Sequence, residues 1–204
     1  MSAILRLTQE SIVLDQGRLI KRAASPEAVD YYMASGFSKS GERRWDAAEV
    51  PVGAAPFRPI AVRVCDMHGQ IVDMLRSTEP ISIEVEYQLD KPIQGLRVGL
   101  YVMSMRGEHV FTSFDTDDAQ KYEQFSIRPA GHYISRCVVP VDTLNEGRYV
   151  VGMNASTYRV KRYFQDERSV TFTVDAVGAP GKQWPEVRMG LVRPRLSWSI
   201  DEQQ

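Results

Sequence analysis

From about residue 57 onward, apolar and polar side chains alternate along the chain with a period of two. In the clearest run, polar side chains separate Ile81, Ile83, Val85 and Tyr87. This alternation is typical of a half-buried antiparallel strand, with one face on a core and the other in water. The same pattern occurs over residues 98–103, 149–154 and 169–174. Further strands are predicted over residues 60–65, 109–114, 122–127, 132–139 and 195–200.

Turn-forming residues separate these runs, with Gly or Pro at 68–69, 90–92, 106–107, 129–131 and 145–147. Roughly seven to nine short strands with this spacing predict a β-sandwich. The segment from Leu144 to Tyr149 resembles the tyrosine corner of immunoglobulin-like sandwiches, in which the phenol bonds back to the backbone. We therefore predict an all-β fold, an immunoglobulin-like antiparallel β-sandwich, over residues 57–204.

The first 36 residues follow a different pattern. Residues 11–20 predict a short β-hairpin around an Asp-Gln-Gly turn. Ser25 and Pro26 are typical of a helix start, and Gly36 can end that helix. A unit of this size cannot bury a core of its own. Residues 1–36 therefore belong either to a larger domain or to the sandwich that follows.

Residues 37–56 are predicted to form a linker or a loosely attached arm. The stretch 38–44 is polar, and the stretch 50–56 consists of small residues and Pro. Neither stretch has the periodicity of a strand or a helix, and such composition is typical of linkers.

Composition excludes several classes of function. The formal net charge of −1 predicts no broad attraction to nucleic acid or to anionic lipid. No run of about 18 apolar residues indicates a membrane span, and Arg6, Glu10 and Asp15 interrupt any signal-peptide core. Cys65 and Cys137 lie in apolar strand-like runs, so buried free thiols in a reducing compartment are expected.

The N-terminal motifs carry a resemblance to a known family. The sequence Ile-Val-Leu-Asp-Gln-Gly-Arg-Leu at 12–19, followed by Ser-Pro-Glu at 25–27, resembles the last segment of an ABC-transporter ATPase domain. No phosphate loop of the form G-x-x-x-x-G-K-[ST] occurs. The resemblance implies that residues 1–36 are the C-terminal remnant of an ATPase domain whose nucleotide-binding motifs lie upstream.

An ATPase tail, a linker and a sandwich in that order resemble the C-terminal part of a Wzt-type ATPase subunit, from the ABC transporters that export O-antigen polysaccharide. Family-like features include Arg44-Trp45, the turn at 66–69, the strand at 80–87 and Leu196-Ser197-Trp198. The resemblance implies a carbohydrate-binding domain that recognises the non-reducing end of the polysaccharide, often through a chemical cap. Binding of that end would couple chain completion to export.

The resemblance also implies partners and a location. The transmembrane subunit of the transporter is expected to bind through the missing ATPase domain, at the cytoplasmic face of the inner membrane. A homodimer is expected, because the ATPase subunits work in pairs. Residues 184–200 follow a Gly-Ala-Pro-Gly hinge at 178–181, so they either exchange between protomers or pack on their own sandwich. No cofactor, metal or catalytic residue is predicted.

Strand alternation predicts which residues face a bound sugar. If the aliphatic side chains face the core, the opposite face has Gly99 and Gly152 as a floor. The predicted carbohydrate-binding residues are Tyr101, Met103, Phe111, Ser113, Asp115, Asn154, Thr171 and Thr173. The alternative is an ordinary sheet surface, since Thr, Tyr and Ser are common on strands and Gly often marks a bulge. A slip of one residue would reverse any of these assignments.

Two further segments have alternative interpretations. Residues 115–118 contain three aspartates, which form a solvated turn or, less favourably, a site for a hard cation. Residues 158–164 mix aromatic rings with three basic side chains. With a net charge near zero we favour a surface loop or strand there, then a contact with an anionic sugar or phosphate cap, and last a site for single-stranded nucleic acid.

Two functional alternatives remain at the level of the whole chain. One is a structural module that only dimerises the transporter. The other is an enzyme that acts on polysaccharide, although no G-x-S-x-G motif supports a serine hydrolase. A binding module without catalytic activity is the function we predict.

Overall fold

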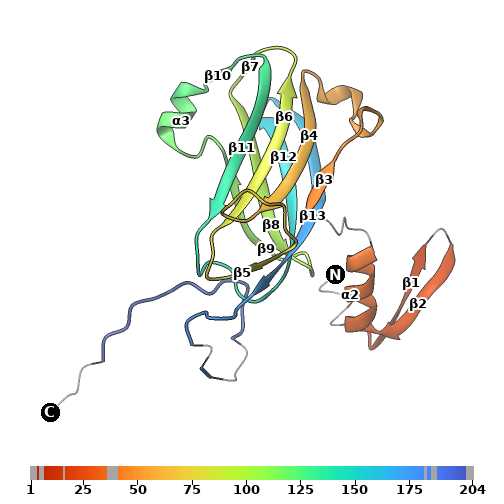
Figure 1. Cartoon of the computed structure of the whole chain (residues 1–204). Coiled ribbons are helices and arrows are strands. Elements are labelled where there is room, and N and C mark those ends of the chain that lie inside the picture. The colour runs from red at the N-terminus through yellow and green to blue at the C-terminus, as the bar shows by residue number, and fades with distance from the viewer. Residues whose placement is uncertain are drawn as a thin grey trace.

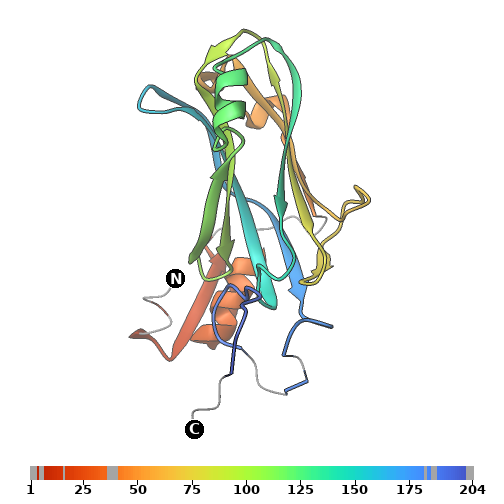
Figure 2. The ribbon, with the colours of Figure 1, turned by 90° about the vertical axis from the view of Figure 1, so that its left-hand side faces the viewer.

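The computed structural model describes residues 4, 7–15, 17–35, 41–181, 183–184 and 188–200, and its main body is a sandwich of two β-sheets (Figures 1 and 2). Sheet I has the order β11-β6-β4-β3, formed by Gly131–Val139, Ile81–Leu89, Phe57–Cys65 and Glu42–Arg44. Sheet II has the order β5-β13-β12-β8-β9, formed by Met74–Arg76, Lys161–Asp175, Gly147–Thr157, Leu96–Ser104 and His109–Phe114. All pairs are antiparallel except β5 with β13. The predicted all-β sandwich is confirmed.

Short elements connect these strands. The 3-10 turns η1 and η2 cover Ala47–Glu49 and Val52–Ala54, and helix α3 covers Ala119–Gln124. Strands β7 and β10, formed by Ile93–Gln94 and Ile127–Arg128, pair with each other in a separate two-stranded sheet. Helix α3 and β10 together lead the chain from the edge of sheet II to the edge of sheet I.

The core lies between the two sheets and follows the predicted alternation. On β6 every second side chain is buried, from Ile81 to Leu89. The rings of Phe57 and Tyr87 stack at 5.1 Å, and those of Tyr149 and Phe172 at 5.6 Å. These rings are at most 1% exposed, so the centre of the sandwich is closely filled.

The predicted tyrosine corner is present at the start of β12. The Tyr149 hydroxyl lies 2.9 Å from the carbonyl oxygen of Asn145 and 2.8 Å from that of Leu191. The Asn145 amide donates to the carbonyl oxygens of Arg188 and Gly190. The corner therefore holds residues 188–191 against the sandwich of their own chain.

The outer face of sheet I carries charged side chains that are paired. Arg63 donates to Glu86 and, at 2.7 Å, to Glu42. Arg136 donates to Glu84 at 2.7 Å, and His132 lies 2.8 Å from the other oxygen of Glu86. Opposite charges therefore face each other across neighbouring strands, the arrangement that stabilises a solvated sheet face.

The N-terminal segment forms the predicted hairpin and helix. Strands β1 and β2, Glu10–Asp15 and Arg18–Ala24, pair antiparallel, and helix α2 covers Ser25–Ser35. Val13 on the hairpin and Ala28 and Val29 on the helix are buried against each other's elements. Gln16 in the turn and Gly36 after the helix lie outside the described residues.

The described part of the predicted linker differs from the prediction. Residues 37–40 lie outside the described residues, whereas residues 41–56 join the sandwich through β3 and through the buried side chains of Trp45 and Ala54. Strand β3 pairs with β4, and the ring of Trp45, 9% exposed, meets that of Phe164 at 5.3 Å. A three-residue edge strand of charged side chains shows no periodicity in the sequence, because its partner strand rather than its own pattern orders it.

The strand predicted over residues 122–127 is wrong. Residues 119–124 form helix α3, and only Ile127 and Arg128 are extended. The Asp118 carboxylate accepts a hydrogen bond from the backbone N–H of Lys121 at 3.1 Å. This N-cap starts a helical turn, in which Tyr122 and Phe125 are three residues apart, as on one face of a helix. Only Phe125 and Ile127 keep the two-residue spacing of a strand.

The strand predicted over residues 195–200 is also absent from this chain. After Asp175 the described residues form no strand, and only an isolated bridge joins Val192 to Leu144. Leu196, Trp198 and Ile200 are 66%, 88% and 98% exposed. The apolar alternation of this segment is therefore not satisfied by a sheet within the chain.

Candidate functional site

Two aromatic rings contact two glycines on the outer face of sheet II. Gly152 on β12 is paired with Tyr101 on β8, and a Cβ added at Gly152 would lie 2.0 Å from the Tyr101 ring. Gly99 is paired with Phe114 on β9, and its added Cβ would lie 2.4 Å from that ring. Only glycine leaves room for such contacts. Both glycines that were predicted to form the floor of a sugar site are therefore on the outer face, but aromatic rings occupy the space above them.

Tyr101 is held tightly in this position. Its side chain is only 8% exposed, and its hydroxyl donates to the carbonyl oxygen of Asp166 at 3.1 Å. Burial raises the pKa of Tyr101 to about 12, so the hydroxyl keeps its proton at neutral pH. With Met103 and Val150 the ring forms a small apolar cluster on the outer face. Tyr101 and Met103 therefore face outward as predicted, but Met103 packs in this cluster and does not line a hollow.

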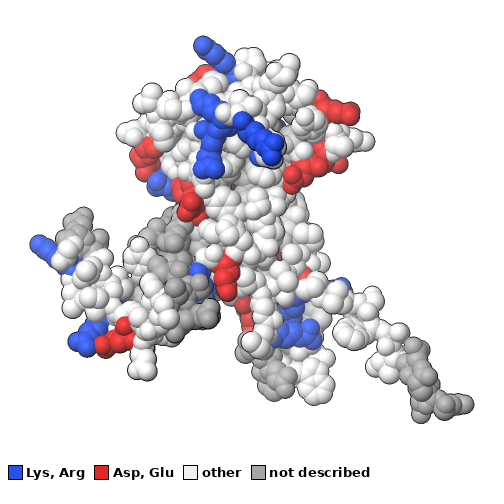
Figure 3. Space-filling view, turned by 180° about the vertical axis from the view of Figure 1, so that it is seen from behind, with Lys and Arg blue, Asp and Glu red and all other residues white. Residues whose placement is uncertain are grey.

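Beside these rings the outer face has a hollow of about 430 Å³, which we call the outer-face hollow. It lies at the end of sheet II where the β12–β13 hairpin turns, on the face that Figure 3 displays. Its lining consists of Arg97, Tyr101, Thr112, Phe114, Asn154, Ser156, Thr157, Tyr158, Arg159, Val160, Lys161 and Arg162. The Ser156 hydroxyl donates to the side-chain oxygen of Asn154 at 2.9 Å. Of the predicted residues, Tyr101 and Asn154 meet here.

Thr171 and Thr173 are on the same face but not in this hollow. Thr171 is paired with Val150, four residues along β12 from Asn154, which corresponds to about 13 Å of strand. Thr171 and Thr173 line a smaller hollow of about 300 Å³ beside Arg148, which donates to the Thr171 hydroxyl at 3.3 Å. The predicted residues Tyr101 and Asn154 therefore line one hollow, and Thr171 and Thr173 line another.

Phe111, Ser113 and Asp115 face the side opposite to the predicted one. Directly paired residues share a face, and the pairs on β8 and β9 include Val102 with Phe111 and Leu100 with Ser113. Val102 and Leu100 are core residues, so the predicted outward set points inward, and Phe111 packs against the core. Thr112 and Phe114 take the outward positions instead. The physical reason is the one-residue parity of strands, because the sequence of β9 does not alternate strictly.

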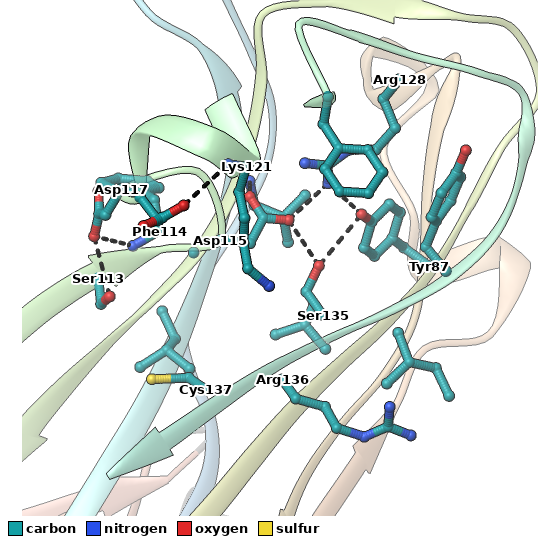
Figure 4. A pocket seen from close by; sticks show the side chains of 18 residues that line it. Tyr87, Ser113, Phe114, Asp115, Asp117, Lys121, Arg128, Ser135, Arg136 and Cys137 are labelled. Atoms are coloured by element: carbon teal, nitrogen blue, oxygen red, sulfur yellow. Dashed lines mark hydrogen bonds and ion pairs between the residues drawn. The ribbon is translucent and has the colours of Figure 1, made fainter. Parts of the chain in front are cut away.

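Ser113 and Asp115 line a second cavity, of about 540 Å³, which we call the inter-sheet cleft (Figure 4). Arg128, only 2% exposed, donates to Asp115 at 2.7 Å and also to the Tyr87 hydroxyl. Ser135 donates to the same Asp115 oxygen at 2.7 Å. Burial lowers the pKa of Arg128, but the hydrogen bond and charge of Asp115 outweigh burial, so the net shift is upward and the guanidinium stays charged. These groups largely satisfy one another and link the edges of the two sheets.

The comparisons with known proteins decide the family. Residues 58–193 match the sequence profile of the Wzt C-terminal domain family. This chain belongs to that family. Its fold is similar to that of a solved structure titled "Crystal structure of the C-terminal domain of wzt", with a TM-score of 0.59 and 13% identity, over 81% of this chain and 92% of that chain. At this identity the likeness concerns the fold alone. No curated protein matches the chain.

In this Wzt C-terminal domain the aspartates at 115–118 have structural roles. Asp117 accepts hydrogen bonds from the Ser113 hydroxyl at 3.1 Å and from the backbone N–H of Phe114 at 2.8 Å, Asp118 caps α3, and Asp115 binds Arg128. Among the described residues no cluster of His, Cys, Asp and Glu is arranged to hold a metal ion. The turn interpretation therefore accounts for these side chains.

None of the helices in the described residues is long and apolar enough to cross a membrane.

Sequence reasoning missed five lining residues of the Wzt domain's hollow, namely Arg97, Thr112, Phe114, Ser156 and Thr157. A signal for two of them was available. Arg97 precedes Gly99 by two residues, and Ser156 follows Asn154 by two, so both share the outward parity of the predicted residues. Thr112 and Phe114 were missed because the parity of β9 was reversed.

Proposed function

We propose that this Wzt C-terminal domain binds the non-reducing end of a bacterial O-antigen polysaccharide, with or without a terminal cap, and thereby couples chain completion to export by an ABC transporter. The observation that carries the proposal is the outer-face hollow on this fold. Its volume of about 430 Å³ is within the range of roughly 300–1,000 Å³ that is usual for ligand sites. Binding, not catalysis, is the proposed activity.

The side chains at the hollow suit the selection of one saccharide terminus. Asn154 and Ser156 present amide and hydroxyl groups next to one another, and Thr112 adds a hydroxyl from β9. A sugar that leaves a buried polar group unpaired loses about 1–3 kcal/mol, which is about tenfold or more in affinity. A few such groups are enough to separate a correct terminus from an incorrect one.

The proposal includes the partners and the location implied by the family. Residues 1–36, with the hairpin and helix α2, are proposed to be the end of an ATPase domain that binds the transmembrane subunit at the cytoplasmic face of the inner membrane. A homodimer through exchange of the C-terminal segment is supported by the exposure of Leu196, Trp198 and Ile200. Nucleic acid is not among the proposed partners.

The direct test is a calorimetric titration of the purified chain with polysaccharide from cells that encode it. Asn154→Ala is expected to weaken binding at least about tenfold. Gln88→Ala, on the outer face of sheet I, is the matched control and is expected to bind normally. Equal affinity of the wild-type chain and Asn154→Ala would remove the hollow from the proposal.

The same preparation separates the alternatives. Lys121→Ala alters the inter-sheet cleft, and a loss of binding in this variant alone would place the sugar there, near the predicted Ser113 and Asp115. Dimerisation without any binding of polysaccharide would favour a purely structural module. Shortened polysaccharide after long incubation would show that the chain is an enzyme that cleaves the polysaccharide.

A further inference from the structure

We propose that the outer-face hollow recognises a negatively charged group, a carboxylate or a phosphate, on the bound saccharide; this inference rests on the proposed function. Among the described residues, four basic side chains line the hollow, and no Asp or Glu does. Figure 3 shows Lys and Arg side chains gathered on this face near one end of the sandwich, with acidic side chains to either side. The four basic residues are Arg97, Arg159, Lys161 and Arg162.

The gathering of these charges is not a consequence of composition. The chain has 25 basic and 26 acidic residues, and on sheet I basic side chains such as Arg63 and Arg136 are bound to carboxylates. In contrast, the described residues provide no carboxylate within ion-pair distance of any of the four basic side chains at the hollow. Like charges repel when they are held close together. An anionic ligand would remove this repulsion.

Arg97 is held in place for such a ligand. Its guanidinium lies 4.3 Å from the centre of the Phe114 ring and 5.0 Å from that of Tyr158. Its Nε is buried and has no hydrogen-bond partner among the described residues. Because a guanidinium stacked on rings loses little freedom on binding, its planar donors are ready for the two oxygens of a carboxylate or phosphate.

Arg159 occupies a backbone position that favours glycine. It lies in the turn between β12 and β13, where the Val160 N–H donates to the Thr157 carbonyl at 3.0 Å, and its φ is 58°. A positive φ at the third position of such a turn is ordinarily taken by Gly or Asn. Side chains kept in unfavourable backbone conformations concentrate at functional sites. The arginine side chain at the rim of the hollow is therefore the feature to explain, and an anionic ligand explains it.

The surroundings favour a charged sugar over nucleic acid. Tyr101 is only 8% exposed, and the Phe114 ring is in contact with Gly99 and with the Arg97 guanidinium. The Tyr158 ring is 61% exposed, but the guanidinium groups of Arg97 and Arg159 lie 5.0 and 5.2 Å from its centre, where a base would have to stack. The basic residues surround a local hollow on a chain with a net charge of −1. Nucleic-acid grooves instead neutralise many phosphates in a row.

The test compares three forms of polysaccharide from cells that encode the chain, each titrated against the full chain: the native form, a carboxyl-reduced form and a dephosphorylated form of equal length. We expect one of the two treatments to weaken binding at least about tenfold, the scale of one lost charge-assisted contact. The treatment that does so identifies the anion. Unchanged binding of both treated forms overturns this inference alone, whereas no binding of the native form overturns the proposed function.

Variants of the turn give an independent readout. Arg159→Gly removes one charge and relieves the unfavourable φ, so thermal stability is expected to stay equal or rise while affinity for the native polysaccharide falls at least about fivefold. Affinity for the neutralised form is expected to stay unchanged. Arg106→Gly, in the turn at the other end of β8, is the matched control and is expected to bind like the wild-type chain. An equal loss toward native and neutralised polysaccharide, or binding of single-stranded DNA or anionic vesicles in its place, overturns the inference.

Discussion

At the scale of single residues, sheet II depends on two glycines that allow rings to lie on its surface. The Tyr101 ring covers Gly152, and the Phe114 ring covers Gly99. These contacts fix the floor of the outer-face hollow and hold the ring on which Arg97 stacks. The sequence placed both glycines on the outer face correctly, but residue type alone does not show which cross-strand ring will fill the space above a glycine.

A methyl group at Gly152 should disturb this arrangement. Its Cβ would lie 2.0 Å from the Tyr101 ring and 2.8 Å from the backbone oxygen of Glu167. Gly152→Ala is therefore expected to destabilise the chain by about 1–3 kcal/mol through overpacking. Gly53→Ala, whose added Cβ meets nothing within 4 Å, is the control. Urea denaturation measures both, and equal midpoints for the two variants would contradict the contact.

The Glu86 carboxylate on sheet I should make stability depend on pH. Burial alone raises the pKa of Glu86, but the hydrogen bonds from Arg63 and His132 outweigh burial and bring the pKa below the usual 4.5. Because the pKa is lower in the folded state, the unfolded chain binds more protons near that value. The stabilisation by Glu86 is therefore present above pH 4.5 and is lost as the pH falls through the folded-state pKa.

Glu86→Gln tests this dependence by urea denaturation over a series of pH values from neutral into acid. The variant is expected to be less stable than the wild-type chain at neutral pH, and the difference should shrink as the pH falls through the folded-state pKa, where the wild-type carboxyl also becomes uncharged. A difference of the same size across the series would show that Glu86 contributes by packing and not by charge.

At the scale of elements, the face of a strand could be predicted where apolar residues recur at every second position, and it was predicted wrongly where they do not. In β6 apolar and polar residues alternate throughout, and in β8 the aliphatic residues Leu96, Val98, Leu100 and Val102 recur at every second position, so both strands were predicted on the correct face. In β9 the apolar residues Val110, Phe111 and Phe114 follow no period of two, so the face of Ser113 and Asp115 was reversed. β3 and α3 depend on a partner strand and on the Asp118 cap, which periodicity does not report.

The tyrosine corner was predictable because its residues are close together in sequence. Tyr149 is 1% exposed, and its hydroxyl reaches the backbone at Asn145 and Leu191. Tyr149→Phe is expected to lower the free energy of unfolding by about 1–2 kcal/mol, because a buried carbonyl loses its donor. Tyr122→Phe, at a side chain 58% exposed, is the control. Thermal denaturation within error of the wild-type chain for Tyr149→Phe would argue against the corner.

At the scale of the whole molecule, the last described residues expose apolar side chains that the rest of this chain does not cover. The corner holds residues 188–191, but the apolar side chains of Leu196, Trp198 and Ile200 extend away from the core. Sequence alternation predicted a strand there, and a strand needs a neighbour that this chain does not supply within its described residues. Exchange with a second copy would supply one.

Removal of residues 194–204 tests the proposed exchange. The complete chain is expected to sediment as a dimer at micromolar concentration, and the truncated chain as a folded monomer, because the sandwich keeps its own core. Circular dichroism checks that the truncated chain keeps its β structure. Identical sedimentation of the two chains would rule out a dimer that depends on this segment.

The central claim is that the outer-face hollow of sheet II holds the polysaccharide terminus. The most direct measurement is amide chemical-shift mapping of the isotope-labelled chain during titration with the native polysaccharide. The account predicts the largest changes at Arg97, Asn154 and the turn at 158–162, with little change on sheet I. Changes confined to the inter-sheet cleft around Lys121 and Ser135, or none at saturating polysaccharide, would contradict it.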